Sequence, residues 1–192
     1  MEALKQFDEV TNPDPRTQIF CIFDEETGKH RPVRLEDHYQ EAVMARLNES
    51  VPEKLRSHFA TAQNLLVYSW YFYPFQMAAE LNAYASLEFA LRERLRPGDP
   101  KLGFKDLLRQ AHAMKLIADD RFELFTPRTA PSRLPKDVDA AVQVRTYVDV
   151  LIDTMPSLRN YLAHGTTMLA PNAATTLLLC ADLINQLYAP LA

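Results

Sequence analysis

The stretch "FQMAAELNAYASLEFALRERL" (residues 75–95) decides the fold class. Its apolar residues recur at the three- and four-residue spacing that places them on one face of an α-helix. Pro74 interrupts the preceding run, and "RPGDP" (96–100) stops the pattern. The sequence therefore predicts one long helix over 75–95, with a buried face formed by Met77, Leu81, Tyr84, Leu87 (or Glu88) and Leu91.

The same periodicity recurs on both sides of this helix. Asp37 is the expected cap of an earlier helix, whose apolar residues include Tyr39 and Val43. Pro156 either kinks a later helix or begins a new one, and the proline-bearing segment 119–135 is expected to form a loop. The further predicted helices span 37–47, 50–70, 103–117, 137–155 and 172–188.

The N-terminal part of the chain has a different pattern. "QIFCIF" (18–23) and "HRPVRL" (30–35) are rich in residues that favour strands, and the turn between them contains Gly28. The pattern predicts a β-hairpin within an extension over 1–36, followed by a helical domain over 37–192. The expected fold class is all-α, a helical bundle with a small N-terminal β-hairpin.

Composition and net charge limit the kinds of protein to which this chain can belong. The chain has 192 residues, of which 47% are hydrophobic and 24% charged, and its net charge is −4. This balance is typical of a soluble globular protein and gives no overall attraction to nucleic acid. Cys21 and Cys180 lie far apart, and the apolar stretch 65–75 is too short to span a membrane. We therefore expect a cytoplasmic protein with free thiols and no membrane contact.

The stretch "SLRNYLAHGTTML" (157–169) contains the candidate site. On a helix, Asn160 and His164 share a face, whereas Arg159 lies about 140° round from His164. Histidine transfers protons near neutral pH, and the guanidinium of arginine pairs with phosphate. With an amide to orient them, these groups are the minimum for cleaving RNA by attack of the 2′-hydroxyl on the adjacent phosphorus. Leu158, Tyr161 and Leu162 are the expected buried side of this helix.

The segment "LRNYLAHG" (158–165) resembles the signature of the HEPN superfamily, in which an Arg, usually followed by Asn, precedes a His by four to six intervening residues. Four residues separate Arg159 from His164 in this chain. The stretch 83–95 is also similar to the second long helix of the family. The resemblance covers roughly residues 55–190 and leaves out the hairpin.

The resemblance implies a HEPN-like bundle of four core helices plus accessory helices, which dimerises so that two motifs line one cleft. Many members are metal-independent endoribonucleases without a cofactor, and act as toxins or in antiviral defence. Arg159 and His164 would then be the catalytic pair and Asn160 a supporting residue. RNA is the implied substrate, and an antitoxin or another regulatory protein is the implied partner. Other members are catalytically silent modules that bind RNA, a nucleotide or a protein.

A purely structural role for the motif is also open, since a His beside a helix-terminating Gly is often only a cap.

Charged and phenolic side chains outside the motif are further candidates for the site. Glu88 and Tyr84 lie on one face with Glu80 and are candidate supporting residues, while Glu80 is expected to be solvated. The chain lacks the paired Glu-x-x-His sequences of a di-metal bundle, so we expect no metal. A local basic excess could follow an RNA backbone or simply be solvated, and comprises Arg92, Arg94, Arg96, Lys101, Lys105 and Arg109.

Overall fold

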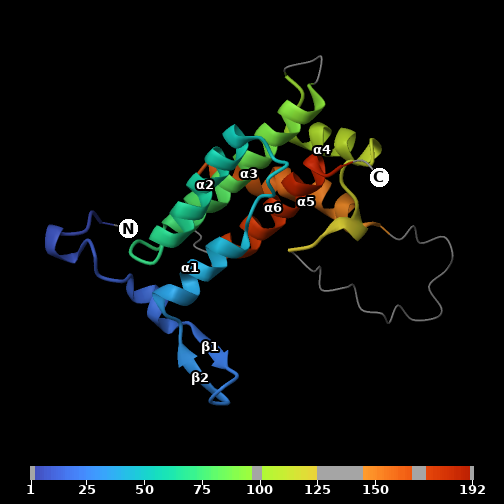
Figure 1. Ribbon diagram of the computed structural model, residues 1–192. Coiled ribbons are helices and arrows are strands. Elements are labelled where there is room, and N and C mark those ends of the chain that lie inside the picture. Colours follow the sequence, from blue (N-terminus) through green and yellow to red (C-terminus); the bar gives the residue numbers. More distant parts are fainter. Residues whose placement is uncertain (1–2, 97–100, 125–144, 166–171, 191–192) are drawn as a thin grey trace, which may run out of the picture.

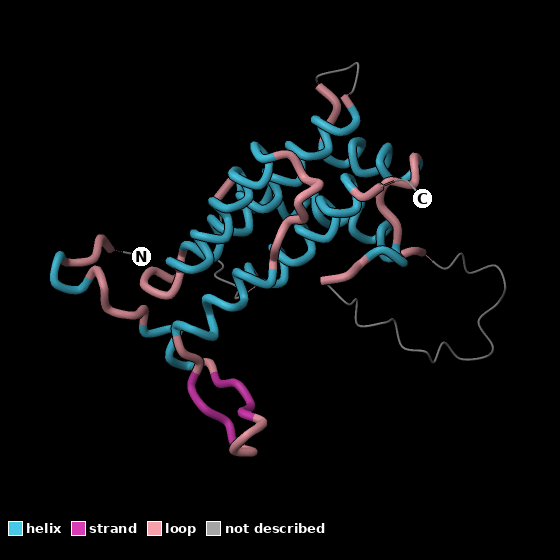
Figure 2. Tube along the Cα trace, viewed as in Figure 1, coloured by secondary structure: helices cyan, strands magenta, loops and turns pink. Residues whose placement is uncertain are grey.

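The computed structural model describes residues 3–96, 101–124, 145–165 and 172–190. Within these ranges the chain is mainly helical, and Figure 2 shows strands only in the hairpin. The helices are α1 (Leu35–Met44), α2 (Glu53–Tyr68), α3 (Phe75–Leu95), α4 (Phe104–Ala113), α5 (Tyr147–Ala163) and α6 (Ala173–Tyr188). The strands β1 (Cys21–Asp24) and β2 (Lys29–Pro32) pair antiparallel. The predicted fold class is confirmed.

Helix α3 is the central element of the bundle, packed against α2, α4, α5 and α6 (Figure 1). Its most buried positions include small residues such as Ala79, Ala83 and Ala90, which let neighbouring helices approach closely. Leu87 and Leu91 are fully buried, whereas the predicted core residues Met77 and Leu81 are only half-buried. A helix surrounded on several sides has no single apolar stripe, so its hydrophobic periodicity identifies only part of its contact surface.

Helix α1 differs from the prediction in its cap and in its buried face. Arg34 precedes its first turn as the N-cap, and the Asp37 carboxylate accepts a hydrogen bond from the Arg34 backbone N–H at 2.9 Å. Asp37 is therefore the third residue of the helix and not its cap. Tyr39 and Val43 are exposed, because α1 buries His38 and Ala42 instead and packs against α2.

The hairpin projects beyond the bundle near the start of α1 (Figure 1). Gly28 in its turn has a φ of +66°, a conformation that favours glycine and was expected there. A two-stranded hairpin is marginal alone, and the segment before it is fixed to the bundle through Asp14. The Asp14 backbone N–H donates to the Trp70 carbonyl at 2.8 Å, and its carboxylate accepts from the Tyr73 N–H at 3.0 Å and pairs with Arg16 at 2.8 Å.

Asp14 makes this attachment pH-dependent. Burial alone would raise the pKa of Asp14, but hydrogen bonds from Arg16 and the Tyr73 N–H outweigh it and lower the pKa from 3.8 to about 2. The ionised carboxylate therefore stabilises the fold above pH ~4, and this contribution is lost as the pH falls from about 4 to 2. We expect Asp14→Asn to cost about 2 kcal/mol at pH 7 and much less near pH 2, measured by urea unfolding. A difference from wild type that stays constant over this range would contradict the role of Asp14.

Two other predicted segments have different boundaries. The helix expected over 137–155 begins at Tyr147, and residues 137–144 lie outside the described part of the chain. Pro156 lies inside α5, so the motif belongs to a helix that continues through the proline. The helix expected over 103–117 is shorter, ending at Ala113, with Lys115 at a φ of +57° just beyond it.

Candidate active site

Helix α5 carries the motif in its last two turns. The helix begins with a capping box, in which Asp149 N–H donates to Thr146 Oγ1 and the Asp149 carboxylate accepts from the Thr146 N–H. It ends at Ala163, and the C-cap residue His164 donates its N–H to the Asn160 carbonyl at 3.0 Å. Gly165 follows at a φ of +85°, which terminates the helix as predicted.

The buried stripe of α5 determines where each motif side chain points. Met155 is buried, and four residues later the stripe reaches Arg159 and then the half-buried Leu162. Leu158 and Tyr161 are 51% and 50% exposed, so the expectation that they form the buried side is wrong. Arg159 therefore lies on the buried side of α5, where Leu158 was expected.

Arg159 reaches across the bundle to α3. Its Nη2 lies 3.1 Å from Glu88 Oε2, and the other Glu88 oxygen lies 2.8 Å from Nη2 of Arg92. The Glu88 side chain is only 16% exposed. Arg92 also donates to the carbonyl of Leu102 at 2.9 Å, just before α4. Glu88, a candidate supporting residue in the sequence, thus contacts the motif directly.

The remaining polar groups of the motif lie nearer the surface. Arg159 Nη1 donates to Asn160 Oδ1 at 3.1 Å, so Asn160 and Glu88 together fix the plane of the guanidinium. Arg159 Nε is buried without a hydrogen-bond partner among the described residues. The His164 side chain is exposed, and no described residue hydrogen-bonds its imidazole. His164 is therefore open to solvent while Arg159 is held in place.

Glu88 is shared by two arginines. Arg92 and Arg159 each place a guanidinium nitrogen within 3.1 Å of its carboxylate. The Arg159 guanidinium is half-buried, and in that position it attracts an anion more strongly than a fully solvated one would. Arg159 is therefore able to pair with a phosphate, while the exposed His164 lies about 140° round the same helix.

Tyr84 lies in a different cluster, between α3 and α6. Thr176 Oγ1 donates to Glu80 Oε2 at 3.1 Å, and Tyr84 also hydrogen-bonds Thr176. Burial raises the pKa values of Glu80, Tyr84 and the nearby Cys180 thiol. The expectation of a solvated Glu80 is therefore wrong, and the structure does not bring Tyr84 to the motif. Glu88 follows Glu80 by eight residues, which is slightly more than two turns of the helix. Its side chain therefore faces α5, whereas that of Glu80 faces α6.

The predicted basic residues divide between faces. Arg92 joins Arg159 through Glu88, and Lys105 of α4 pairs with Asp153 of α5 at 2.8 Å, so these two lie on the side of the motif helix. Arg94 instead donates to the Leu187 carbonyl of α6 at 2.8 Å. Arg109 pairs with Asp106 in its own helix. The excess predicted along the sequence is therefore not one continuous surface.

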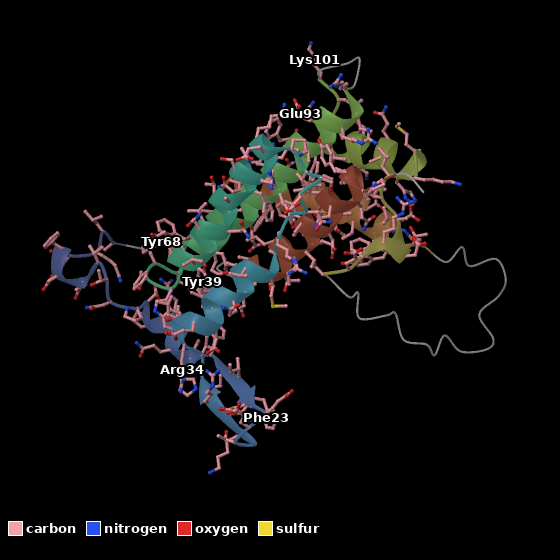
Figure 3. All side chains as sticks on the ribbon, in the orientation of Figure 1. Phe23, Arg34, Tyr39, Tyr68, Glu93 and Lys101 are labelled. Atoms are coloured by element: carbon pink, nitrogen blue, oxygen red, sulfur yellow. The ribbon has the colours of Figure 1, made fainter. Side chains whose placement is uncertain are left out.

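Arg96 and Lys101, in the middle of this basic region, are exposed. Arg96 caps α3 with a φ of +44°, and Lys101 lies with Glu93 at the end of the bundle remote from Phe23 of the hairpin (Figure 3). The sequence-based prediction missed Arg145, which pairs with Asp153 just before α5. The Thr-x-x-Asp capping sequence at 146–149 is the signal that would have placed Arg145 at a helix start.

Two features are absent from the described residues: a metal-binding cluster and a helix able to cross a membrane. They contain no cluster of three or more His, Cys, Asp or Glu side chains able to hold a metal ion. No helix in them combines the length and apolar character needed to cross a membrane.

Comparison with known proteins gives no relative. No protein family, no curated protein and no solved structure matches the chain. Its function is therefore inferred from the site itself and from the motif in α5.

Proposed function

We propose that this protein is a metal-independent endoribonuclease of HEPN type, with Arg159 and His164 as its catalytic pair and Asn160 in support. The observation that supports the proposal is the Arg159 guanidinium, which Glu88 and Asn160 hold in one orientation on the helix that also carries the exposed His164. The Arg-Asn-x3-His motif is the reason for proposing the HEPN type. The corresponding biological role is that of a cytoplasmic toxin or defence protein, restrained by a protein partner.

The chemistry follows from these groups. His164 removes the proton from a ribose 2′-hydroxyl, whose oxygen attacks the adjacent phosphorus as the bond to the 5′-oxygen of the next nucleotide breaks. The proton taken up by His164 is returned through water to that leaving oxygen, which gives a 2′,3′-cyclic phosphate and restores the neutral imidazole. Arg159 stabilises the negative charge that builds up on the non-bridging phosphate oxygens. Glu88 and Asn160 hold the guanidinium, so little ordering is needed when the phosphate arrives.

The test is incubation of the purified full chain with single-stranded RNA in excess chelator. We expect RNA products ending in 2′,3′-cyclic phosphate, identified by mass spectrometry. Absence of any cleavage, under conditions where the protein is folded, would reject the proposal.

A catalytically silent HEPN module is the second candidate. The pairing of Arg159 with Glu88 and its half-buried position favour it, because the same contacts also suit an arginine that only joins α5 to α3. RNA binding without cleavage in the same assay would select this alternative. Neither binding nor cleavage, together with a stable dimer, would leave a structural role for the motif.

We propose further that two copies pair through the exposed face of α5. Leu158, Tyr161 and Val150 are large apolar residues exposed on this helix, and Tyr161 lies one turn before His164. Exposed apolar residues gathered on one helix face favour association. Pairing here would bring the exposed histidines of two copies together, which compensates for the separation of Arg159 and His164 around one helix.

Tyr161→Glu is expected to weaken this dimer at least about tenfold, because a buried aromatic anchor is replaced by a charge that must lose its water. Sedimentation equilibrium measures the effect against wild type. Tyr39→Glu is the matched control, since Tyr39 is equally exposed but belongs to α1, and it is expected to leave the equilibrium unchanged. A monomeric wild type, or equal weakening by both variants, would contradict this interface.

A further inference from the structure

A second site lies far from the motif along the chain, between the hairpin, α1, the α2–α3 turn and the first turn of α6. This hairpin pocket has a volume of about 360 Å³, in the range of small-ligand sites. Its walls include Phe20, Trp70 and Tyr73, and its polar side chains include His38, Glu41 and Gln76. None of these residues takes part in the proposed RNA chemistry.

His38 lies in the wall of the pocket next to Glu41. The residue is 7% exposed, and its Nε2 lies 2.7 Å from the carbonyl oxygen of Leu66. Since a carbonyl only accepts, Nε2 carries a hydrogen atom. The other ring nitrogen, Nδ1, lies 3.6 Å from Glu41 Oε2. His38 therefore positions its ring beside the Glu41 carboxylate at the pocket.

Gln76 adds an acceptor to the Glu41 carboxylate. The Ser69 hydroxyl donates to Leu66 O at 2.6 Å, so Ser69 Oγ must accept the 2.9 Å hydrogen bond from the Gln76 amide nitrogen. This fixes the orientation of the amide and leaves its oxygen without a partner among the described residues, although Gln76 is 7% exposed. The oxygen is not among the fully buried unpaired atoms, so a molecule in the pocket can reach it.

Glu41 supplies the carboxylate of the hairpin pocket among the described residues that line it. The Arg16 guanidinium lies 5.0 Å from the centroid of the Tyr73 ring in the wall, and its charge is paired with Asp14. Among the described residues, the half-exposed Glu41 carboxylate has no ion-pair partner other than His38. The first turn of α6 borders the pocket through Ala174 and Thr175, but the helix end carries only about half a positive charge, which the carboxylate exceeds.

We propose that the hairpin pocket binds a guanidinium group. The group is planar, carries five N–H donors and a positive charge, and stacks on aromatic rings while pairing with a carboxylate. These properties complement the Glu41 carboxylate, the unpaired Gln76 oxygen and the aromatic walls. The source is either a small guanidine compound or an arginine side chain of a protein partner.

The fluorescence of Trp70 reports binding directly, because Trp70 is the single tryptophan of the chain and forms part of the wall. Titration of the full chain with methylguanidinium chloride at constant ionic strength is expected to give a saturable change, with a Kd on the order of 1 mM. Tetramethylammonium has the charge without N–H donors, and methylurea has donors without the charge. Neither is expected to give a saturable change, and an equal response to either one would overturn the proposal.

Variants of α1 separate recognition from folding. Glu41→Gln keeps the side-chain shape, lies at a half-exposed position and removes the charge, so we expect binding to weaken about tenfold or more. Glu36→Gln removes an exposed carboxylate from the same helix outside the pocket and is expected to bind like wild type. Unchanged binding by Glu41→Gln would overturn the proposal.

Two further ligands distinguish a small guanidine compound from an arginine side chain of a protein partner as the natural source of the guanidinium group. Free arginine is expected to bind more tightly than a capped Gly-Arg-Gly peptide if the pocket serves a small molecule, and more weakly if it receives the side chain of a protein. Failure of both to bind would overturn the proposal. Because the pocket and the α5 motif share no residue, either result leaves the RNA cleavage test unaffected.

Discussion

Replacement of His164 by alanine is expected to lower the rate of RNA cleavage by about 10²–10⁴-fold, the usual contribution of a general acid or base. The His164 side chain is exposed and makes no hydrogen bond to a described residue, so its loss removes no packing. The thermal unfolding midpoint is therefore expected to change by less than about 2 °C. Cleavage rates are measured on the same RNA in chelator, with the midpoint taken from circular dichroism.

His30→Ala is the matched control, because His30 is an exposed histidine on β2 of the hairpin. We expect cleavage by this variant at the wild-type rate. Wild-type activity in His164→Ala would remove His164 from the mechanism, and an equal loss in both variants would show that the effect is not specific to the motif.

Replacement of Leu87 by alanine is expected to lower the free energy of unfolding by about 2–5 kcal/mol. Leu87 is fully buried on α3, the helix that packs against four others, so surrounding side chains have little freedom to fill the space left behind. A domain of this size has a total stability of about 5–15 kcal/mol, so the variant loses a large part of it. Urea unfolding monitored by circular dichroism measures the change.

Leu4→Ala makes the same chemical change at a residue that is 93% exposed. Its effect on the free energy of unfolding is expected to stay within about 0.5 kcal/mol. A cost for Leu87→Ala as small as that of Leu4→Ala would contradict the central position of α3.

The sequence predicted the helices where local signals agree. Phe75–Leu95 was found because a proline precedes it and a proline-glycine segment follows it, and Gly28 marked the hairpin turn because few other residues adopt its positive φ. Buried faces were harder to predict. On α1, Tyr39 and Val43 have the right spacing for a core face, but the long-range hydrogen bond from His38 to Leu66 turns the other side inward.

The candidate site was predictable in its residue types but not in its contacts. The spacing of Asn160 and His164 and the rotation of Arg159 away from them follow from helix geometry alone. The ion pair between Arg159 and Glu88 joins residues 71 positions apart, and no local pattern reveals such a pair. The exposure of Tyr161 was missed for a related reason, since it depends on which neighbour α5 contacts.

The sharing of Glu88 also bears on how tightly an RNA would be held in salt. Release of condensed counterions makes the affinity for single-stranded nucleic acid fall with the logarithm of salt concentration, by a slope of about 0.7 for each phosphate neutralised. Arg159 already pairs with the Glu88 carboxylate, so a phosphate that binds this arginine competes with that ion pair. The RNA affinity at Arg159 would thus fall with salt by no more than the slope for one phosphate.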